Sequence, residues 1–205
     1  MFAELLRRKM KGIADLTAVQ MGMLEAHYGL MVRWNKVMNL TRVENLEEAV
    51  ELHYAESLFL AAHLPAESLK IADVGSGAGF PGFPVAVLRP DCSVTLIEAH
   101  RRKSVFLREV SRGVGNVRVL VCRAEDVDER FDRVISRAVS YEDLSGILKK
   151  LAPSADLLSG AGEPPAAMGI AWQEPIVLPW ARGRYLRCGK ASVSRETLPS
   201  VSRET

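Results

Sequence analysis

Three glycines at alternate positions follow an acidic residue in the segment 73–82, which reads D-V-G-S-G-A-G-F-P-G. Glycine lets a backbone turn sharply and approach a ligand closely, and the free N–H groups at a helix start bind anionic groups. The apolar run 69–74 precedes this turn, and a helical pattern with Pro81 near its start follows it. The segment therefore predicts a strand, a glycine turn and a helix that together bind a nucleotide-type cofactor.

The spacing of these glycines separates two kinds of cofactor. The dinucleotide-binding fingerprint is G-x-G-x-x-G. Here the pattern is D-x-G-x-G-x-G, formed by Asp73, Gly75, Gly77 and Gly79. It resembles motif I of the S-adenosylmethionine-dependent methyltransferases that have a Rossmann-like sheet. The next predicted strand, 93–97, ends in Glu98, about twenty residues after the turn, where an acid can hold ribose hydroxyls.

Four separated motifs, between about residues 17 and 140, resemble one family. Trp34-Asn35-Lys36 followed by Asn39-Leu40-Thr41 resembles W-N-K-x-x-N-L-T, and the segment 53–57, H-Y-A-E-S, is similar to H-x-x-D-S. The segment 73–84 resembles D-V-G-T/S-G-x-G-x-P-G-x-P, and 135–138 matches I-S-R-A. The family with these motifs is the small-subunit ribosomal RNA methyltransferase G family, also called glucose-inhibited division protein B.

The resemblance implies a reaction and a cofactor. Family members use S-adenosylmethionine to methylate N7 of a guanosine in a hairpin loop of 16S ribosomal RNA near the decoding site. Guanine N7 carries no proton, so its methylation needs in-line placement rather than a general base. We therefore name no catalytic residue, with Arg137 as the best candidate. By resemblance, the cofactor-binding residues are Asp73, Gly75, Gly77, Gly79, Phe80, Glu98, Ala124, Glu125 and Arg137.

Basic residues that follow Glu98 are candidates for contact with RNA phosphates. They are Arg101, Arg102 and Lys103, and a solvated helix face is the alternative interpretation. The target base lies in a loop, so it can stack on an aromatic side chain such as Phe80 or Trp34.

Two further positions leave a question open. Arg137 can orient either the methionine carboxylate of the cofactor or an RNA phosphate by a bidentate contact. Where the family usually has a lysine before the glycine that follows the fifth strand, this chain has Ser159-Gly160. One basic contact to RNA or cofactor is therefore in doubt.

Hydrophobic periodicity predicts the elements that position these residues. Helices are expected over 17–37, 46–63, after Pro81, after Glu98 to about 112, and over 141–151. The buried stripe of the first comprises Met21, Leu24, Tyr28, Met31 and Val32, and that of the helix after Glu98 comprises Val105, Phe106, Leu107 and Val110. Strands are expected over 69–74, 93–97, 117–121, 131–135 and 155–158, with Val177 and the segment 185–188 in the last two.

These elements predict a Rossmann-like class I α/β fold, with a seven-stranded, mostly parallel sheet whose last strand is antiparallel and helices on both faces. We expect an N-terminal helical extension, 1–64, packed on a methyltransferase domain, 65–190. The segment 191–205 contains an exact repeat of S-V-S-R-E-T and is expected to be disordered.

Composition limits the other possibilities. A chain of 205 residues with a net charge of +2 suits one domain, and its charge alone does not indicate a nucleic-acid partner. Cys92, Cys122 and Cys188 form no C-x-x-C pair, which indicates reduced thiols in a cytoplasmic protein. The four histidines lack metal-ligand spacing and no apolar run reaches membrane length, so we expect no metal, no membrane contact and a monomer.

Two alternatives remain open. The chain could be another enzyme of similar fold, either a methyltransferase with a different substrate or a nicotinamide-dependent oxidoreductase, and cofactor retention separates these. It could also be an RNA-binding or ribosome-assembly protein that retains the fold without catalysis. Methyl transfer to 16S RNA or to 30S particles tests that interpretation.

Overall fold

The computed structural model describes residues 1–43 and 45–192. Two helices, α1 (Phe2–Met10) and α2 (Ala18–Asn35), come first. The α2 helix begins at a capping box, in which the Thr17 side chain accepts from the Gln20 N–H and the Gln20 side chain accepts from the Thr17 N–H. It ends at Asn35, whose Oδ1 accepts from the N–H groups of Leu40 and Thr41 at 2.8 and 3.0 Å. The predicted helix is confirmed, and this side-chain cap ends it two residues early.

The predicted helix over 46–63 is also confirmed, with a feature that periodicity did not reveal. It consists of α3 (Leu46–Ala49), the π-helical turn η1 (Val50–Ala55) and α4 (Glu56–His63). A π-helical turn is wider than an α-helical one and occurs often at functional sites. The widened turn contains His53 and directly precedes Glu56 of the H-x-x-E-S motif.

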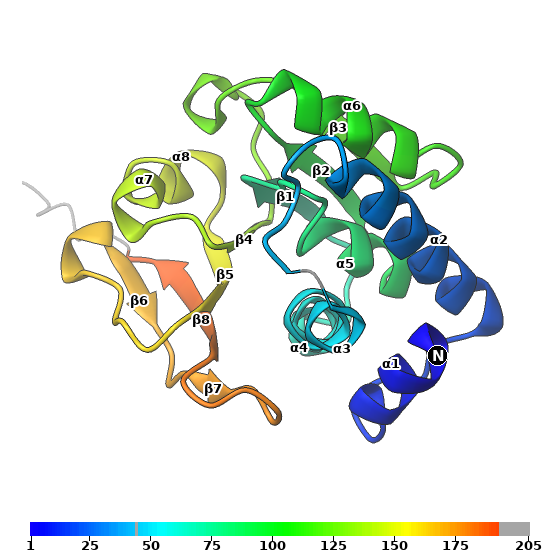
Figure 1. The fold of residues 1–205 in the computed structure, drawn as a ribbon. Helices are drawn as coiled ribbons and strands as arrows, with labels where there is room; N and C mark the ends of the chain where they lie inside the picture. Colours follow the sequence, from blue (N-terminus) through cyan, green and yellow to red (C-terminus); the bar gives the residue numbers. More distant parts are fainter. Residues whose placement is uncertain (44, 193–205) are drawn as a thin grey trace, which may run out of the picture.

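The sheet has eight strands, one more than predicted. In spatial order they are β3-β2-β1-β4-β5-β8-β6, with β7 also paired to β8 (Figure 1). The first five strands are parallel and β8 is antiparallel to β5. The additional strand is β6, a three-residue segment too short to give an alternating pattern. Strand bounds are β1 (Lys70–Val74), β2 (Ser93–Ile97), β3 (Val117–Leu120), β4 (Arg133–Arg137), β5 (Ser154–Ser159), β6 (Ile170–Trp172), β7 (Ile176–Val177) and β8 (Tyr185–Ala191).

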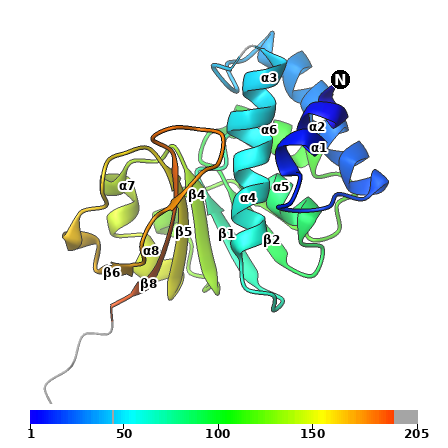
Figure 2. The same cartoon turned by 90° about the horizontal axis from the view of Figure 1, so that it is seen from below.

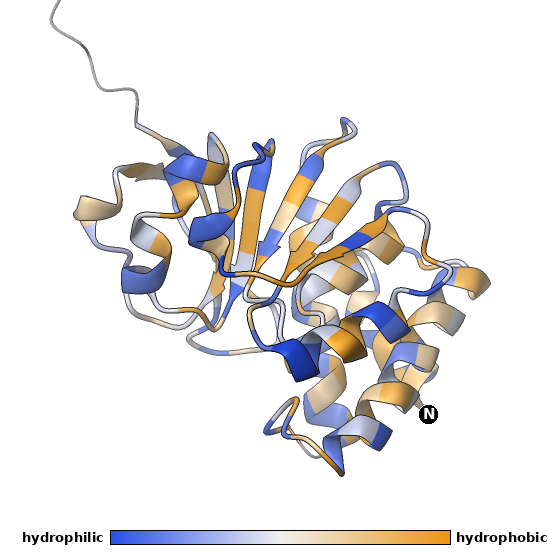
Figure 3. Cartoon of the chain, turned by 90° about the horizontal axis from the view of Figure 1, so that it is seen from above, coloured by the Kyte–Doolittle hydropathy of each residue, from blue (hydrophilic) through white to orange (hydrophobic). Residues whose placement is uncertain are grey.

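Helices cover both faces of the sheet. Helices α1, α2, α4, α5 and α6 contribute to one hydrophobic core, whereas α7 and α8 contribute to a second core on the other face (Figures 1 and 2). Hydrophobic stretches run along the central strands between these two layers (Figure 3). The remaining bounds are α5 (Gly82–Leu88), α6 (Arg101–Val110), the 3-10 turns η2 (Ala124–Asp126) and η3 (Ala166–Met168), α7 (Tyr141–Ser145) and α8 (Leu148–Leu151).

Two predicted core positions are wrong. Val32 of α2 is 40% exposed, and Val105 of α6 is 53% exposed. At 100° per residue, Val105 points away from the face that its buried neighbours Phe106 and Leu107 share, and Val32 lies beyond the edge of the buried stripe of α2. The predicted helix over 141–151 is broken into α7 and α8 at Gly146, since glycine weakens a helix interior.

None of the described helices combines the length and the apolar character needed to cross a membrane. The repeated tail falls outside the described residues, apart from its first two positions.

Candidate active site

The glycine turn after β1 is fixed to the neighbouring strands. The N–H groups of Gly75 and Ser76 donate to the Ile97 carbonyl at the end of β2, at 3.0 and 3.2 Å. Gly75 has φ +73°, and a Cβ atom there would lie 2.6 Å from Cγ2 of Val139, just after β4. Only glycine therefore fits this position, both in backbone conformation and in space.

Glu98 lies against the same turn. Its Oε2 accepts from the Gly77 N–H at 2.9 Å, and its Oε1 accepts from the His100 N–H at 2.7 Å. The two parallel strands have the register Val74 with Ile97, so the turn and the acid leave the sheet side by side. The structure therefore brings together these two parts of the predicted cofactor site.

Asp73, at the end of β1, is completely buried. Its Oδ2 accepts from the Gly82 N–H at 2.9 Å, whereas its Oδ1 has no hydrogen-bond partner among the described residues. Burial raises the pKa of this carboxyl to about 7. A Cβ atom on Gly82 would lie 2.5 Å from Oδ2, so the close approach of helix α5 to the carboxylate requires glycine there.

Arg137, the last residue of β4, points towards the N-terminal extension. Its Nη1 donates to the Leu52 carbonyl in the π-helical turn, and its guanidinium carbon lies 5.3 Å from the centroid of the Phe80 ring. Its Nε is buried without a partner among the described residues. Burial lowers the pKa of Arg137 to about 10, so the side chain is still protonated at neutral pH.

Phe80 is only 3% exposed. The His53 ring stacks on it at a centroid distance of 4.7 Å, and the Tyr54 ring meets it edge-on at 5.0 Å. Trp34 packs against Phe106 at 5.7 Å. In this structure Phe80 is therefore a packing residue beneath the turn and is not open to stacking by an RNA base.

His53 joins the two N-terminal motifs. Its Nε2 lies 2.7 Å from Oγ1 of Thr41, and its Nδ1 has no partner among the described residues. Burial, followed by the positive charge of Arg137, lowers the pKa of His53 to about 3, so the ring is neutral. Ser57 donates from Oγ to the His53 carbonyl, within the same motif.

Sequence reasoning missed His27, which supports the glycine turn from α2. Its Nε2 lies 3.0 Å from the Ala78 carbonyl, which can only accept, so Nε2 carries the proton. Its Nδ1 then accepts from the Tyr54 hydroxyl at 2.7 Å. Burial lowers the pKa of His27 to about 3. The sequence did contain one indication that His27 is buried, because it lies at helical spacing between Leu24 and Met31 in the buried stripe.

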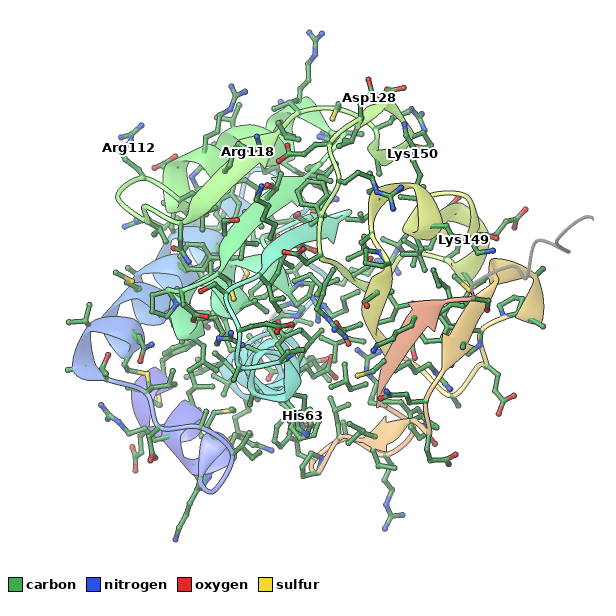
Figure 4. The ribbon with its side chains drawn as sticks, turned by 180° about the vertical axis from the view of Figure 1, so that it is seen from behind. His63, Arg112, Arg118, Asp128, Lys149 and Lys150 are labelled. Atoms are coloured by element: carbon green, nitrogen blue, oxygen red, sulfur yellow. The ribbon has the colours of Figure 1, made fainter. Side chains whose placement is uncertain are left out.

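The predicted contacts after β3 lie in η2. Ala124 is buried and Glu125 is exposed, and the Glu125 carbonyl accepts from Lys150 of α8. Figure 4 labels Lys150 beside Asp128, with which it forms an ion pair at 3.6 Å. No hydrogen bond links the Ala124 or Glu125 side chain to the glycine turn in the described part of the chain.

The basic cluster at the start of α6 borders a cavity. Its volume is about 410 Å³, and the residues that line it include Lys36, His100, Arg102 and Lys103. Arg101 is exposed but does not line it. No ion pair between described residues includes Lys36, Arg102 or Lys103. Sequence analysis quoted Lys36 within the W-N-K motif but did not predict it as an RNA contact. Its place beside Arg102 and Lys103 depends on the packing of the loop after α2 near α6.

The structure gives the Ser159 position a neighbouring positive charge. Arg187 of β8, which is 6% exposed, donates from Nε to Oγ of Ser159 at 3.0 Å and from Nη2 to the Gly162 carbonyl at 3.2 Å. The positive charge next to Ser159 is therefore that of Arg187, which lies on the adjacent antiparallel strand β8.

Within residues 1–43 and 45–192, no group of three His, Cys, Asp or Glu side chains is arranged to bind a metal ion.

The arrangement fits S-adenosylmethionine. The Gly77 backbone leaves open space, where a Cβ atom would meet only the Gly75 carbonyl at 3.8 Å. Asp73 Oδ1 and Arg137 Nε are buried polar atoms, one an acceptor and one a donor, and neither has a hydrogen-bond partner within the described part of the chain. A ligand with an ammonium group, a carboxylate and ribose hydroxyls has suitable groups for Asp73, Arg137 and Glu98.

Comparison with known proteins places this site in a family. The family described as rRNA small subunit methyltransferase G matches residues 20–158. The ribosomal RNA small subunit methyltransferase G of Chromobacterium violaceum is 37% identical over 168 residues, covering 80% of this chain and 78% of that protein. Its counterpart from Xanthomonas campestris pv. campestris (strain B100) is 38% identical over 170 residues, covering 75% and 78%.

Solved structures share the fold at low sequence identity. The ribosomal protein L11 methylase of Lactobacillus delbrueckii subsp. bulgaricus superimposes with a TM-score of 0.56 at 13% identity, covering 69% of this chain and 80% of that one. TYW2 of M. jannaschii in complex with AdoMet gives a TM-score of 0.52 at 18% identity, covering 69% and 75%. The predicted Rossmann-like methyltransferase fold is confirmed.

Proposed function

The chain belongs to the rRNA small subunit methyltransferase G family, and we propose that it methylates N7 of a guanosine in a hairpin loop of 16S rRNA. The proposed methyl donor is S-adenosylmethionine, and the substrate is 16S rRNA or the small ribosomal subunit. The observation that carries this proposal is the contact between the glycine turn and Glu98, next to the unpartnered atoms of Asp73 and Arg137.

Each of these groups has a binding role in the proposed site. The Glu98 carboxylate is the acceptor for the ribose hydroxyls, and Asp73 Oδ1 is the acceptor for the ammonium group. Arg137 is the donor for the methionine carboxylate, and the glycine turn supplies N–H groups and a close backbone surface. When bound, the cofactor supplies a methyl group on a sulfonium centre, which a neutral nitrogen lone pair can attack.

The chain then has to orient the base rather than remove a proton. Guanine N7 has a free lone pair, so alignment and exclusion of water supply most of the rate enhancement. The neutral forms of His27 and His53 suit this interpretation, because their buried rings hold the turn in place and take no part in proton transfer. Of the two roles left open for Arg137, this proposal takes the contact with the cofactor carboxylate, so no side chain is assigned to the reacting centre.

For RNA, we propose that Arg102 and Lys103 bind backbone phosphates at the cavity that they share with Lys36, and that the exposed Arg101 binds beside it. Neutralising these side chains should weaken RNA binding and reduce its salt dependence, because fewer counterions are released from the RNA. Affinity for S-adenosylmethionine should not change in such variants, since no hydrogen bond among the described residues joins the side chain of Arg101, Arg102 or Lys103 to the glycine turn.

The test combines cofactor affinity with nucleoside mapping. Calorimetry with Gly75→Asp should show no S-adenosylmethionine binding, because the Cβ atom of any side chain there meets Val139 and the φ of +73° is strained for aspartate. Gly146→Asp is the matched control, since a Cβ atom there meets nothing within 4 Å and its φ is ordinary. Neither protein should bind NAD.

In cells that lack this gene, the 16S rRNA should lack one 7-methylguanosine. Wild type and Gly146→Asp should restore it, and Gly75→Asp should not. Unchanged cofactor affinity in Gly75→Asp would refute the assignment of this turn. A nucleoside map that is the same with and without the gene would refute the proposed substrate.

A further inference from the structure

Glu56 of the H-x-x-E-S motif is a completely buried carboxylate with a single arginine on both of its oxygens. Arg184, in the turn between β7 and β8, donates from Nε to Oε1 at 2.9 Å and from Nη2 to Oε2 at 2.6 Å. The two residues are 128 positions apart in the chain. Planar, two-bond pairs of this kind are strong and geometrically specific.

A second arginine lies in the field of the same carboxylate. Of the charges around Arg137, Glu56 raises its pKa the most, Arg184 lowers it, and Asp73 raises it less. Glu56 therefore influences both guanidinium groups but is hydrogen-bonded to Arg184, and burial raises the pKa of the nearby Asp73 carboxyl to about 7. No ion pair of the described residues includes Arg137. A buried cation without a paired anion is costly, so this space favours an anionic ligand.

Arg184 occupies both oxygens of Glu56, whereas Arg137 bonds to the neutral carbonyl of Leu52, four residues before Glu56 in the same helical segment. The Nε of Arg137 has no hydrogen-bond partner among the described residues. If Arg184 were lost, Glu56 would be a buried carboxylate without its ion-pair partner, close to the carbonyl that binds Arg137. Attraction at low dielectric would then draw Arg137 onto Glu56 and away from its present position.

We propose that Arg184 is a positioning residue that keeps Glu56 occupied and so leaves Arg137 available to the methionine carboxylate of the cofactor. This inference rests on the proposed function. A small carboxylate suits Arg137 better than an RNA phosphate, because its Nε is buried, its Nη1 bonds to the Leu52 carbonyl and its guanidinium carbon lies 5.3 Å from the Phe80 centroid.

The measurement is the affinity for S-adenosylmethionine, by calorimetry, in single and double variants. Arg184→Gln should weaken binding about ten-fold, the effect of losing one charge-assisted bond between Arg137 and the ligand. The double variant Arg184→Gln/Glu56→Gln should regain most of that affinity, because the competing carboxylate is gone. Because Glu56→Gln also removes an unpaired buried carboxylate, recovery is required by the inference but is decisive only together with the ligand control below.

Two controls limit the effect to the amino-acid end of the cofactor and to Arg184. Affinity for 5′-methylthioadenosine, which lacks both the carboxylate and the ammonium group of methionine, should be the same in wild type and Arg184→Gln. Arg182→Gln removes an exposed positive charge from the same turn and should leave both affinities unchanged. Arg184→Lys retains the charge with poorer geometry and should be intermediate, which keeps the test available if Arg184→Gln does not fold.

The outcomes distinguish the inference from the proposal beneath it. If Arg137→Gln weakens S-adenosylmethionine binding but Arg184→Gln does not, the inference fails and the proposed function stands. A double variant without recovery overturns it as well. If wild type binds no S-adenosylmethionine, or Arg137→Gln has no effect on binding, the cofactor role of Arg137 fails and the inference fails with it. Equal weakening of 5′-methylthioadenosine would assign Arg184 a general structural role.

Discussion

Replacing Asp73 by asparagine should stabilise the folded protein, and the gain should grow as the pH rises. Burial raises the folded-state pKa of Asp73 from 3.8 to about 7. The folded state therefore keeps a proton that the unfolded state releases above about pH 4, and stability falls as the pH rises through this window. Asparagine has no charge to desolvate, and its Oδ1 can still accept from the Gly82 N–H.

The size of the effect follows from the shift. A displacement of about three pKa units corresponds to at most about 4 kcal/mol of stability lost by the wild type once Asp73 is fully ionised. Integrated over the titration, the free energy of unfolding of Asp73→Asn minus that of wild type should increase by about 2.5 kcal/mol between about pH 5 and pH 8. Such a change is a substantial fraction of the total stability of an ordinary domain, which is about 5–15 kcal/mol.

Urea unfolding of both proteins across this pH range measures the difference. His27 and His53 also titrate in the unfolded state, but they do so in both proteins, so the difference removes their contribution. Asp128→Asn is the control for the substitution itself, because the Asp128 side chain is 99% exposed. A difference between Asp73→Asn and wild type that stays constant with pH would show that Asp73 is ionised in the folded protein, and would refute the argument.

Three further substitutions test other parts of the structure. Thr17→Ala removes the capping box of α2 and should lower the free energy of unfolding by about 1 kcal/mol in urea, whereas an unchanged midpoint would contradict the cap. Ala138→Gly should raise the free energy of unfolding by about 1 kcal/mol, because Ala138 has φ +60° and glycine adopts that conformation without strain. A loss of stability in this variant would contradict the strain at Ala138. His27→Phe leaves the Tyr54 hydroxyl and the Ala78 carbonyl buried without this partner and should cost about 2 kcal/mol or more at neutral pH. The lowered pKa of His27 means that wild type loses stability as the pH falls below about 6.5, and urea unfolding of His27→Phe should show a shallower loss.

Local signals were enough to predict the strands, the turn and the acid that form the candidate cofactor site. A β-branched run, a glycine turn and an acid at the end of the next strand specify β1, β2 and Glu98 without reference to the rest of the chain. Their contact then follows from topology, because consecutive parallel strands place their carboxyl ends at one edge of a sheet. The bond between Gly77 and Glu98 is the physical result.

Contacts that depend on distant parts of the chain were not predictable in this way. Periodicity identified the stripe of α2 but assigned its middle position to Tyr28, since nothing in α2 reveals the Ala78 carbonyl that His27 meets. The pair formed by Glu56 and Arg184 joins a helix to a hairpin turn far along the sequence. The burial of Phe80 depends likewise on His53 and Tyr54, which come from the extension.

The two N-terminal motifs acquire a physical meaning through these contacts. Asn35 closes the loop that presents Thr41, Thr41 bonds to His53, and His53 covers Phe80 of the glycine turn. The π-helical turn that contains His53 also supplies the Leu52 carbonyl, which receives Arg137 from β4. The polar residues of the two N-terminal motifs therefore position the segment that contacts Phe80 and hydrogen-bonds to Arg137. A change in any of these bonds should act on Arg137 and the turn together, even where the altered residue touches no ligand.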